Sequence, residues 1–389
     1  FHLVCLYLCA VSSFQIQGNH NRMSEQSSIG EVPVGEQREE PNPKSAKVVH
    51  SDQSVEQGLG SVVASHYNNL EEKGRKERKN SRIFFMRNFN NWIKSCFINI
   101  FLDKIRKQNV DNYPIRVLDL GCGKGGDLLK WQKGHIGHLI MADIAETSVS
   151  QAKDRYMTNK SRGRGRGPGF TAEFITADCT KSRLKDLVEQ PDQQVDLVSC
   201  QFAFHYCFES LPQAETMLRN VSENLKTGGY FIATMPSAYE IMKRLKENGS
   251  TFRNEVFRIQ FPEDRPEDPP LFGDKYNFYL EGVVDCPEFL VHPPTLDKLC
   301  ERWGLKPMWR KPFATLFNEG QRDHEGRKLL GVMKALEMFP ESEQASETAE
   351  EYLHAQEHMS KHSLKKVRTL TKSEWEAIGV YIACAYKKV

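Results

Sequence analysis

The feature that most constrains the fold of this chain is an apolar segment that runs directly into a glycine-rich turn. Residues 117–127 read VLDLGCGKGGD, with glycines at positions 121, 123, 125 and 126. Glycine adopts positive φ without strain and lets a ligand approach the main chain closely. A glycine turn alone is a weak signal, because many such turns only pack a helix against a sheet. Because a helical pattern follows through position 131, the segment predicts the first strand–turn–helix unit of an α/β fold.

Short apolar segments then alternate with helical patterns, as in a sheet built from βαβ units. An amphipathic helical pattern precedes them over residues 81–107. The fold class predicted is therefore α/β, with a mostly parallel, Rossmann-like sheet and helices on both faces. We predict its strands over residues 116–120, 138–143, 172–178, 195–202 and 229–234.

The rest of the sequence is less regular. An Arg/Gly run over residues 159–169 predicts a solvated surface loop. Residues 258–280 have the composition of an aromatic-rich loop, and residues 327–366 show a mostly polar helical pattern. Residues 375–386 are almost continuously apolar and predict a final strand.

The first part of the sequence differs in composition from the remainder. Residues 15–61 are rich in Gln, Glu, Ser, Asn and Pro, so they cannot bury enough apolar area to fold. We therefore predict a disordered polar tail over residues 1–61 and one folded domain over residues 62–389. The apolar run at residues 1–14 lacks an initiating Met and a basic segment before it, and it is too short to span a bilayer. We interpret residues 1–22 as an artefact, with Met23 as the start.

Charge and cysteine usage exclude some classes of protein. The net charge of +2 over 389 residues neither requires nor excludes a nucleic-acid partner. The ten cysteines are scattered and form no CxxC pair. This spacing indicates reduced thiols inside a cell and argues against a structural zinc site, so we expect no metal.

Three aspartates at the ends of successive predicted strands suggest the cofactor. Asp119 lies two positions before the first glycine, Asp143 ends the second strand, and Asp178 ends the third. We expect them to meet an ammonium group, ribose hydroxyls and an adenine amino group. Such a set suits S-adenosylmethionine, which is cationic and carries no phosphate. The glycines also fit the GxGxxG pattern of NAD enzymes, so an oxidoreductase is an alternative.

Several segments together resemble one known family. The segments are RNFNNWIKS, VLDLGCGKGGDLLKW, ITAD, SCQFAFHYCFES and LEGVVDCPEFLV, and the similarity extends from about Val62 to the end of the sequence. They resemble the eukaryotic mRNA cap guanine-N7 methyltransferases in their animal form. The resemblance implies a class I methyltransferase fold with a seven-stranded sheet and inserted cap-binding elements. It implies methyl transfer from S-adenosylmethionine to N7 of the cap guanosine, with S-adenosylhomocysteine as the second product.

The resemblance also implies site residues, which match the family in residue type. Cations near the glycine turn suit the bridging phosphates of a cap, and Glu281 could accept hydrogen bonds from the guanine edge. Seen alone, each of these charges would be read as a solvated surface group. The residues implied for the cofactor are Lys94, Gly121, Asp143, Asp178, Gln201 and Tyr206. Those implied for the cap are Asn90, Asn91, Lys124, Lys130, Arg155, His205, Glu281 and Tyr381.

We expect a reaction without acid or base catalysis. Guanine N7 carries a lone pair and no proton, so His205, Tyr206 and Glu281 are predicted to position the reactants for in-line transfer. By family implication the enzyme acts in the nucleus on capped RNA 5′ ends, without a membrane. Its partners would be a small activating subunit, docking on residues 327–366, and other capping and transcription machinery. The alternatives are a methyltransferase of another RNA, protein or small molecule, and a non-catalytic scaffold, because one fold serves many functions.

Overall fold

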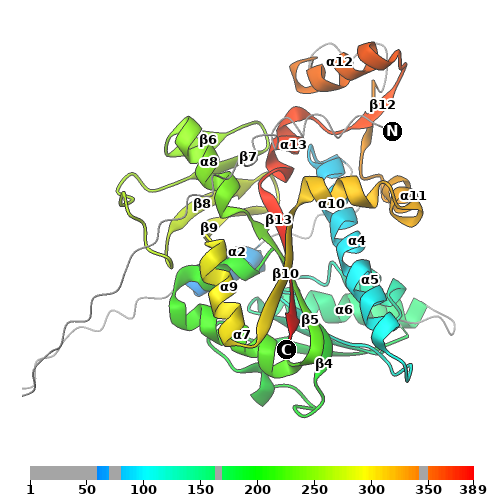
Figure 1. Ribbon diagram of the computed structural model, residues 1–389, viewed down its shortest axis with the longest axis vertical. Coiled ribbons are helices and arrows are strands. Elements are labelled where there is room, and N and C mark those ends of the chain that lie inside the picture. Colours follow the sequence, from blue (N-terminus) through cyan, green and yellow to red (C-terminus); the bar gives the residue numbers. More distant parts are fainter. Residues whose placement is uncertain (1–58, 70–79, 163–168, 341–348) are drawn as a thin grey trace, which may run out of the picture.

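A computed structural model describes residues 59–69, 80–162, 169–340 and 349–389. Its centre is a seven-stranded sheet with the strand order β10-β13-β5-β4-β1-β2-β3. Figure 1 labels β4, β5, β10 and β13 of this sheet. Strands β1 to β5 pair in parallel, whereas β13 runs antiparallel to both of its neighbours. This is the predicted Rossmann-like sheet. Its strands are β1 (Arg116–Leu120), β2 (His138–Asp143), β3 (Thr171–Thr176), β4 (Val195–Gln201), β5 (Leu225–Pro236), β10 (Leu305–Pro312) and β13 (Tyr381–Lys388).

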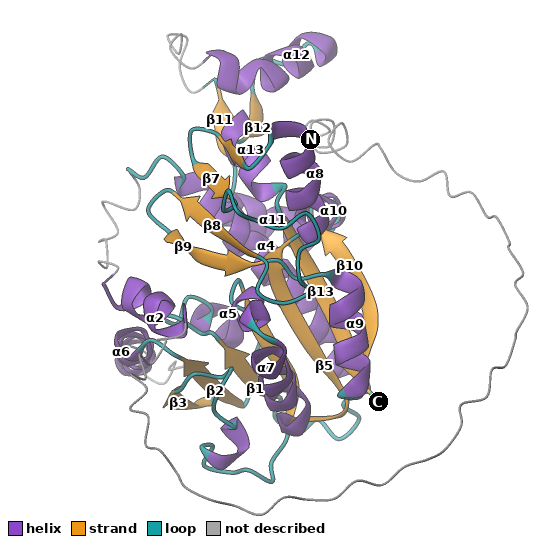
Figure 2. Cartoon of the chain, turned by 90° about the vertical axis from the view of Figure 1, so that its left-hand side faces the viewer, coloured by secondary structure: helices purple, strands orange, loops and turns teal. Residues whose placement is uncertain are grey.

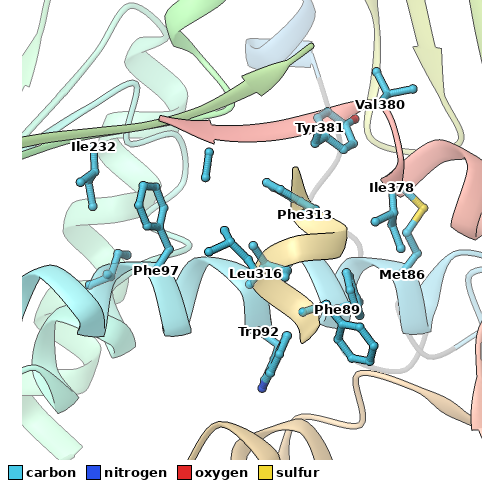
Figure 3. Packing of buried hydrophobic residues seen from close by; sticks show 14 of the residues in the cluster. Met86, Phe89, Trp92, Phe97, Ile232, Phe313, Leu316, Ile378, Val380 and Tyr381 are labelled. Atoms are coloured by element: carbon cyan, nitrogen blue, oxygen red, sulfur yellow. The ribbon is translucent and has the colours of Figure 1, made fainter. Parts of the chain in front are cut away.

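Helices cover both faces of this sheet, and each face has its own apolar core. One core joins the sheet to α4 (Phe84–Gln108), α6 (Glu146–Arg162) and α10 (Phe313–Gly320). The other joins it to α7 (Leu211–Asn224) and α9 (Pro293–Arg302). Figure 3 shows buried side chains of α4 and α10 packed beneath the start of β13. The expected helix over residues 81–107 is therefore α4, which lies directly against the sheet.

A second, antiparallel sheet lies between β5 and α9 in sequence. It consists of β6 (Thr251–Arg253), β7 (Phe257–Gln260), β8 (Lys275–Leu280) and β9 (Val284–Phe289), preceded by α8 (Ala238–Asn248). Residues 258–280 were expected to be rich in loop, yet both ends of that range are strands. In β8, buried residues alternate with more exposed ones, the period expected of a strand with one face in a core.

The C-terminal region also departs from expectation. The predicted strand over residues 375–386 begins instead with α13 (Lys372–Ile378), and β13 starts after it. Thr371 and Glu374 form a capping box, which explains why a helix forms in this apolar run. The predicted polar helix over residues 327–366 is divided into α11 (His324–Val332) and α12 (Leu353–His362). A short antiparallel ribbon pairs β11 (Glu337–Phe339), which follows α11, with β12 (Val367–Thr369), which follows α12 (Figure 2).

The N-terminal boundary and the Arg/Gly run can be compared only in part. Helix α2 (Leu59–Asn69) begins inside the predicted tail, whereas the rest of that tail lies outside the described residues. Helix α6 continues to Arg162, so the predicted loop starts later than residue 159, and residues 163–168 lie outside the description. Among the described helices, none combines the length and hydropathy needed to cross a membrane.

Candidate active site

The glycine turn after β1 forms the floor of the candidate site. Gly121, Gly123 and Gly125 have φ values of 66°, 49° and 70°, a region in which other residues are strained. A Cβ atom at Gly121 would also lie 2.4 Å from Cβ of Ala203, whereas a Cβ at Gly123 would meet nothing within 4 Å. Gly121 is therefore required by packing, and Gly123 leaves open space for a ligand beside the main chain.

A cavity of about 560 Å³, here called the large cavity, opens at the carboxyl ends of the parallel strands above this turn. Ligands bind at this edge in open α/β sheets. All of the residues predicted to hold the cofactor line this cavity, except Asp119. They are Lys94, Gly121, Asp143, Asp178, Gln201 and Tyr206.

Asp143 and Asp178 are each held by local hydrogen bonds. The carboxylate of Asp143 accepts from the N–H of Gly123 at 2.8 Å and of Ala145 at 2.9 Å. Burial raises the pKa of Asp143, whereas these main-chain donors act in the opposite direction. In Asp178, Oδ1 accepts from the N–H of Thr180 at 2.9 Å and from its hydroxyl at 2.6 Å. Since a carboxylate oxygen has two lone pairs, both groups retain acceptor capacity toward the cavity.

Asp119 does not line the large cavity, so the structure does not bring it together with the other residues predicted to hold the cofactor. Its side chain projects from the face of the sheet that α5 (Leu128–Lys133) covers, and it accepts a hydrogen bond from Nε1 of Trp131 at 3.1 Å. Burial, followed by the nearby charge of Asp127, raises the pKa of Asp119 to about 7. Asp119 therefore supports the glycine turn from behind.

A buried charge network joins α4 to α5. Nζ of Lys94 lies 2.9 Å and Nζ of Lys130 lies 2.6 Å from Oδ1 of Asp127, and Lys130 also donates to Oδ1 of Asn91 at 3.0 Å. Burial opposes ionisation of Asp127, yet the two ammonium groups hold its pKa well below the ordinary value. Lys130 lines neither of the cavities described here, so its predicted contact with the cap is replaced by contacts within the protein.

A second cavity of about 190 Å³, the small cavity, adjoins the first. Both are lined by Tyr67, Asn91 and Lys94, so they meet along α4 and α2. The other predicted cap residues divide between the two cavities. Asn90, His205 and Tyr381 line the small cavity, and Lys124 and Arg155 line the large one.

The carboxylate in the small cavity belongs to Glu288, not to Glu281. Glu281 lines neither cavity, so the structure does not bring it together with the other residues predicted to contact the cap. Glu288 is 3% exposed, and its Oε2 accepts a hydrogen bond from the hydroxyl of Tyr276 at 2.9 Å. Glu288 occupies a buried position of β9, whereas Glu281 is in the turn before that strand. A carboxylate at a buried position of an apolar strand is the signal that could have identified it.

His205 and Tyr206 follow β4 in a short 3-10 helix (Phe204–Glu209) and belong to different cavities. Their ring centroids are 4.4 Å apart. Nε2 of His205 lies 3.2 Å from Oε1 of Glu288, yet neither ring nitrogen has a well-directed hydrogen bond to any described residue. His205 is 2% exposed. A buried imidazole with such unsatisfied nitrogens is available to a ligand in the small cavity.

Helix α2 contributes a residue that the sequence analysis missed. The hydroxyl of Tyr67 lies 3.2 Å from the hydroxyl of Tyr206, at the junction of the two cavities. The N–H of Leu59 donates to Glu209 at 3.1 Å, and Asn68 accepts from the N–H of Thr147 at 3.2 Å. These two bonds attach α2 across the large cavity. Burial raises the pKa of Tyr67, so the phenol is neutral.

Among the described residues, no group of His, Cys, Asp or Glu is arranged to hold a metal ion. The residues of the large cavity instead fit S-adenosylmethionine. Gly123 leaves room beside the main chain, and two carboxylates stand at the ends of neighbouring strands.

Comparison with known proteins gives consistent similarities. The sequence profile described as the mRNA (guanine-N(7))-methyltransferase domain matches residues 50–389. An mRNA cap guanine-N(7) methyltransferase of Drosophila melanogaster is 52% identical over 333 residues, which are 84% of this chain and 77% of that protein. One of Caenorhabditis elegans is 42% identical over 84% of this chain and 87% of that protein. Among solved structures, an S-adenosylmethionine-dependent methyltransferase of Clostridium acetobutylicum is 16% identical, with a TM-score of 0.40, over 74% of this chain and 90% of that one.

Proposed function

This chain belongs to the mRNA (guanine-N7)-methyltransferase family and transfers a methyl group from S-adenosylmethionine to N7 of the mRNA cap guanosine, and from this premise we propose how its two cavities divide the reaction. The large cavity holds S-adenosylmethionine and the small cavity holds the cap guanine. The observation that carries this proposal is that the two cavities adjoin, because Tyr67, Asn91 and Lys94 are among the residues that line both. The oxidoreductase and scaffold alternatives lose their support.

In the large cavity, the polar groups match the parts of the cofactor. Asp143, at the end of β2, accepts hydrogen bonds from the ribose hydroxyls, as acidic residues at this position do in related nucleotide sites. Asp178 accepts from the adenine amino group. Gly121 and Gly123 let the amino-acid part lie against the main chain. Lys94, Gln201 and Tyr206 complete the lining.

In the small cavity, Glu288 takes the role that the sequence analysis gave to Glu281. Its carboxylate accepts hydrogen bonds from N1–H and from the exocyclic amine of guanine. Adenine carries neither donor on that edge, so a buried carboxylate here selects guanine. His205 supports Glu288 and offers its unsatisfied nitrogens to the base. Tyr381 and Asn90 bound the same space.

The bridging phosphates of the cap lie toward Lys124 and Arg155 in the large cavity. A guanidinium can hold phosphate oxygens through two parallel hydrogen bonds, and an ammonium acts as a point charge. Lys130 acts indirectly, because its ammonium already binds Asp127 and Asn91. It fixes Asn91 at the junction of the two cavities.

The chain needs no general acid or base for this reaction. Guanine N7 carries a lone pair and no proton, and S-adenosylmethionine supplies a methyl group already activated by its sulfonium. The residues act by orientation. His205, Tyr206 and Glu288 hold the base so that N7 points in line with the methyl group. Positioning of two reactants can contribute about 7–11 kcal/mol to lowering a barrier.

The assignment of one cavity to the cofactor and the other to guanine is tested by incubating the protein with tritiated S-adenosylmethionine and RNA that ends in unmethylated GpppG. We expect label in the 7-methylguanosine cap, and none with RNA ending in ApppG. A Glu288→Ala variant should bind the cofactor and transfer no label, whereas Asp178→Ala should weaken cofactor binding itself. If Glu288→Ala transfers label normally, the small cavity is not the guanine site.

The activating subunit is proposed to dock on the region from α11 to β12. Within this region α12, β11 and β12 form one end of the molecule (Figure 2), and the region exposes apolar side chains, including Val332 at 70% and Leu353 at 51% exposure. Deleting these helices without any change in activator-stimulated activity would contradict this assignment. The substrate is the capped 5′ end of RNA, and we propose action in the nucleus beside other capping and transcription machinery. Imaging of a tagged full chain tests the location.

A further inference from the structure

Helix α4 carries Asn90, Asn91 and Lys94, yet it begins without a cap of its own. Its N-cap residue, Ile83, provides no side-chain hydrogen bond. The first N–H groups of a helix have no partner within that helix and need acceptors from outside. The N–H of Met86 donates instead to Oε1 of Glu374 at 3.2 Å, across 288 positions of sequence.

Glu374 serves a second helix at the same time. Its Oε2 accepts from the N–H of Thr371 at 3.1 Å and from the hydroxyl of Thr371 at 3.1 Å, which completes the capping box of α13. Glu374 is 2% exposed, so water does not substitute for these bonds. One buried carboxylate thus caps two helices, and helix N-termini favour negative charge.

The capped turn of α4 reaches directly into the small cavity. Met86, Arg87 and Asn90 all line that cavity, and Asn90 lies one helical turn beyond Met86. Met86 and Ile378, from α4 and α13, belong to the same buried core (Figure 3). The position of the Met86 N–H therefore sets where this part of α4 stands relative to the bound base.

We propose that Glu374 is a positioning residue of the cap pocket, acting through the main chain of α4. The inference rests on the proposed assignment of the small cavity to guanine. Glu374 does not touch the substrate. It fixes the first turn of α4, and with it the side chains of Met86, Arg87 and Asn90.

A Glu374→Gln variant tests the proposal, because an amide has nearly the same shape but only one acceptor oxygen. That oxygen can cap one of the two helices, and the amide nitrogen cannot accept from either. We expect KM for capped RNA to rise about tenfold, the order of losing one helix cap. The Kd for S-adenosylmethionine should stay within about twofold, since Lys94 is held separately by Asp127.

Glu351 provides a matched control. Its two oxygens accept from the N–H and the hydroxyl of Ser373, both at 2.9 Å, so it also holds the start of α13, and these bonds do not involve α4. Glu351→Gln should leave KM for capped RNA unchanged. If Glu374→Gln folds poorly, Glu374→Asp provides a milder loss of the same bonds and should raise KM at an unchanged Tm.

The proposal is overturned if Glu374→Gln and Glu351→Gln change KM equally. It is also overturned if KM and the cofactor Kd rise together, because that pattern indicates general loosening of the fold. An Asn90→Ala variant distinguishes a failure of the proposal on Glu374 from a failure of the assignment of the small cavity to guanine. If Asn90→Ala raises KM and Glu374→Gln does not, only the inference on Glu374 fails. If neither raises KM, the small cavity is not the guanine site.

Discussion

His205 and Glu288 come from different sheets and meet inside the small cavity, with Nε2 of His205 3.2 Å from Oε1 of Glu288. His205 follows a strand of the central sheet, and Glu288 lies in the antiparallel sheet inserted after β5. The pocket proposed for guanine is thus built at the junction of the two sheets. Its chemistry depends on both parts holding their relative positions.

The first prediction separates the two glutamates of this region. Glu288→Gln replaces one acceptor oxygen with a donor that faces the guanine N–H groups. Losing a buried hydrogen bond to a charged group lowers kcat/KM for capped RNA by about 100-fold. Glu281→Gln, matched in chemistry but outside both cavities, should stay within about twofold. Steady-state kinetics on GpppA-capped RNA measure both, and equal losses would contradict the assignment to Glu288.

The second prediction concerns Tyr67 on α2. Tyr67→Phe removes the hydroxyl that meets Tyr206 at the junction of the cavities. One neutral hydrogen bond contributes about 1 kcal/mol, so kcat/KM should fall about fivefold. Tyr239→Phe is a suitable control, because Tyr239 is 60% exposed and lines neither cavity. If the two variants have indistinguishable kinetics, the hydroxyl of Tyr67 does not contribute to the active site.

The third prediction distinguishes Lys124 from Lys130 by salt dependence. A lysine that contacts phosphate releases a counterion when RNA binds. Lys124→Ala should therefore reduce the magnitude of the slope of log K for RNA binding against log salt concentration by about one, the share of one phosphate contact. Lys130→Met should weaken binding with no change in slope, because its ammonium is held inside the protein. Fluorescence anisotropy with capped RNA at several salt concentrations gives both slopes. A reduced slope for Lys130→Met would show that it contacts phosphate directly.

The fourth prediction is a pH dependence of stability. The pKa of Asp119 rises from 3.8 to about 7 on folding, chiefly through burial. Between these values the folded chain holds more protons than the unfolded chain, so the free energy of unfolding decreases as pH rises. Asp119→Asn keeps an acceptor oxygen for Trp131 and should be about 4 kcal/mol more stable than wild type at pH 8.

Denaturant titrations at pH 4 and pH 8 measure this effect. The advantage of Asp119→Asn should disappear at pH 4, where the wild-type carboxyl is protonated in the folded state. Asp103→Asn, at a side chain 61% exposed, should leave the difference between the two pH values unchanged. The raised pKa of Asp119 would be contradicted if the free energy of unfolding decreased between pH 4 and pH 8 by the same amount in Asp119→Asn and in wild type.

The parts of the fold that follow from local pattern were predictable from the sequence. β1 and β2 have the predicted bounds because each is a continuous apolar run between turn residues. The glycine turn and the end of β2 likewise predicted that Gly121 and Asp143 lie together, since parallel strands end at one edge, whereas Gln201 came only from the family resemblance.

What could not be predicted depends on contacts between distant segments. Helix α2 has a single buried residue, Val63, and is held by partners far along the chain, so no local pattern marks its start at Leu59 or its contact with the large cavity. Which of the two glutamates lines the small cavity depends on the register of β8 with β9, which no periodicity near Glu281 reveals. The orientation of Asp119 depends on Trp131, a partner on a helix.

The place of β13 in the central sheet has a consequence for biosynthesis. This strand follows every other strand in sequence, yet it lies between β5 and β10 and contributes Tyr381 to the small cavity. A ribosome delivers residues 381–388 only after all the other strands have emerged. Until then β5 and β10 present unpaired edges, which are open to pairing with other chains. The nascent chain can assemble the parallel strands β1 to β5 first, but the small cavity is completed only after β13 has been synthesised.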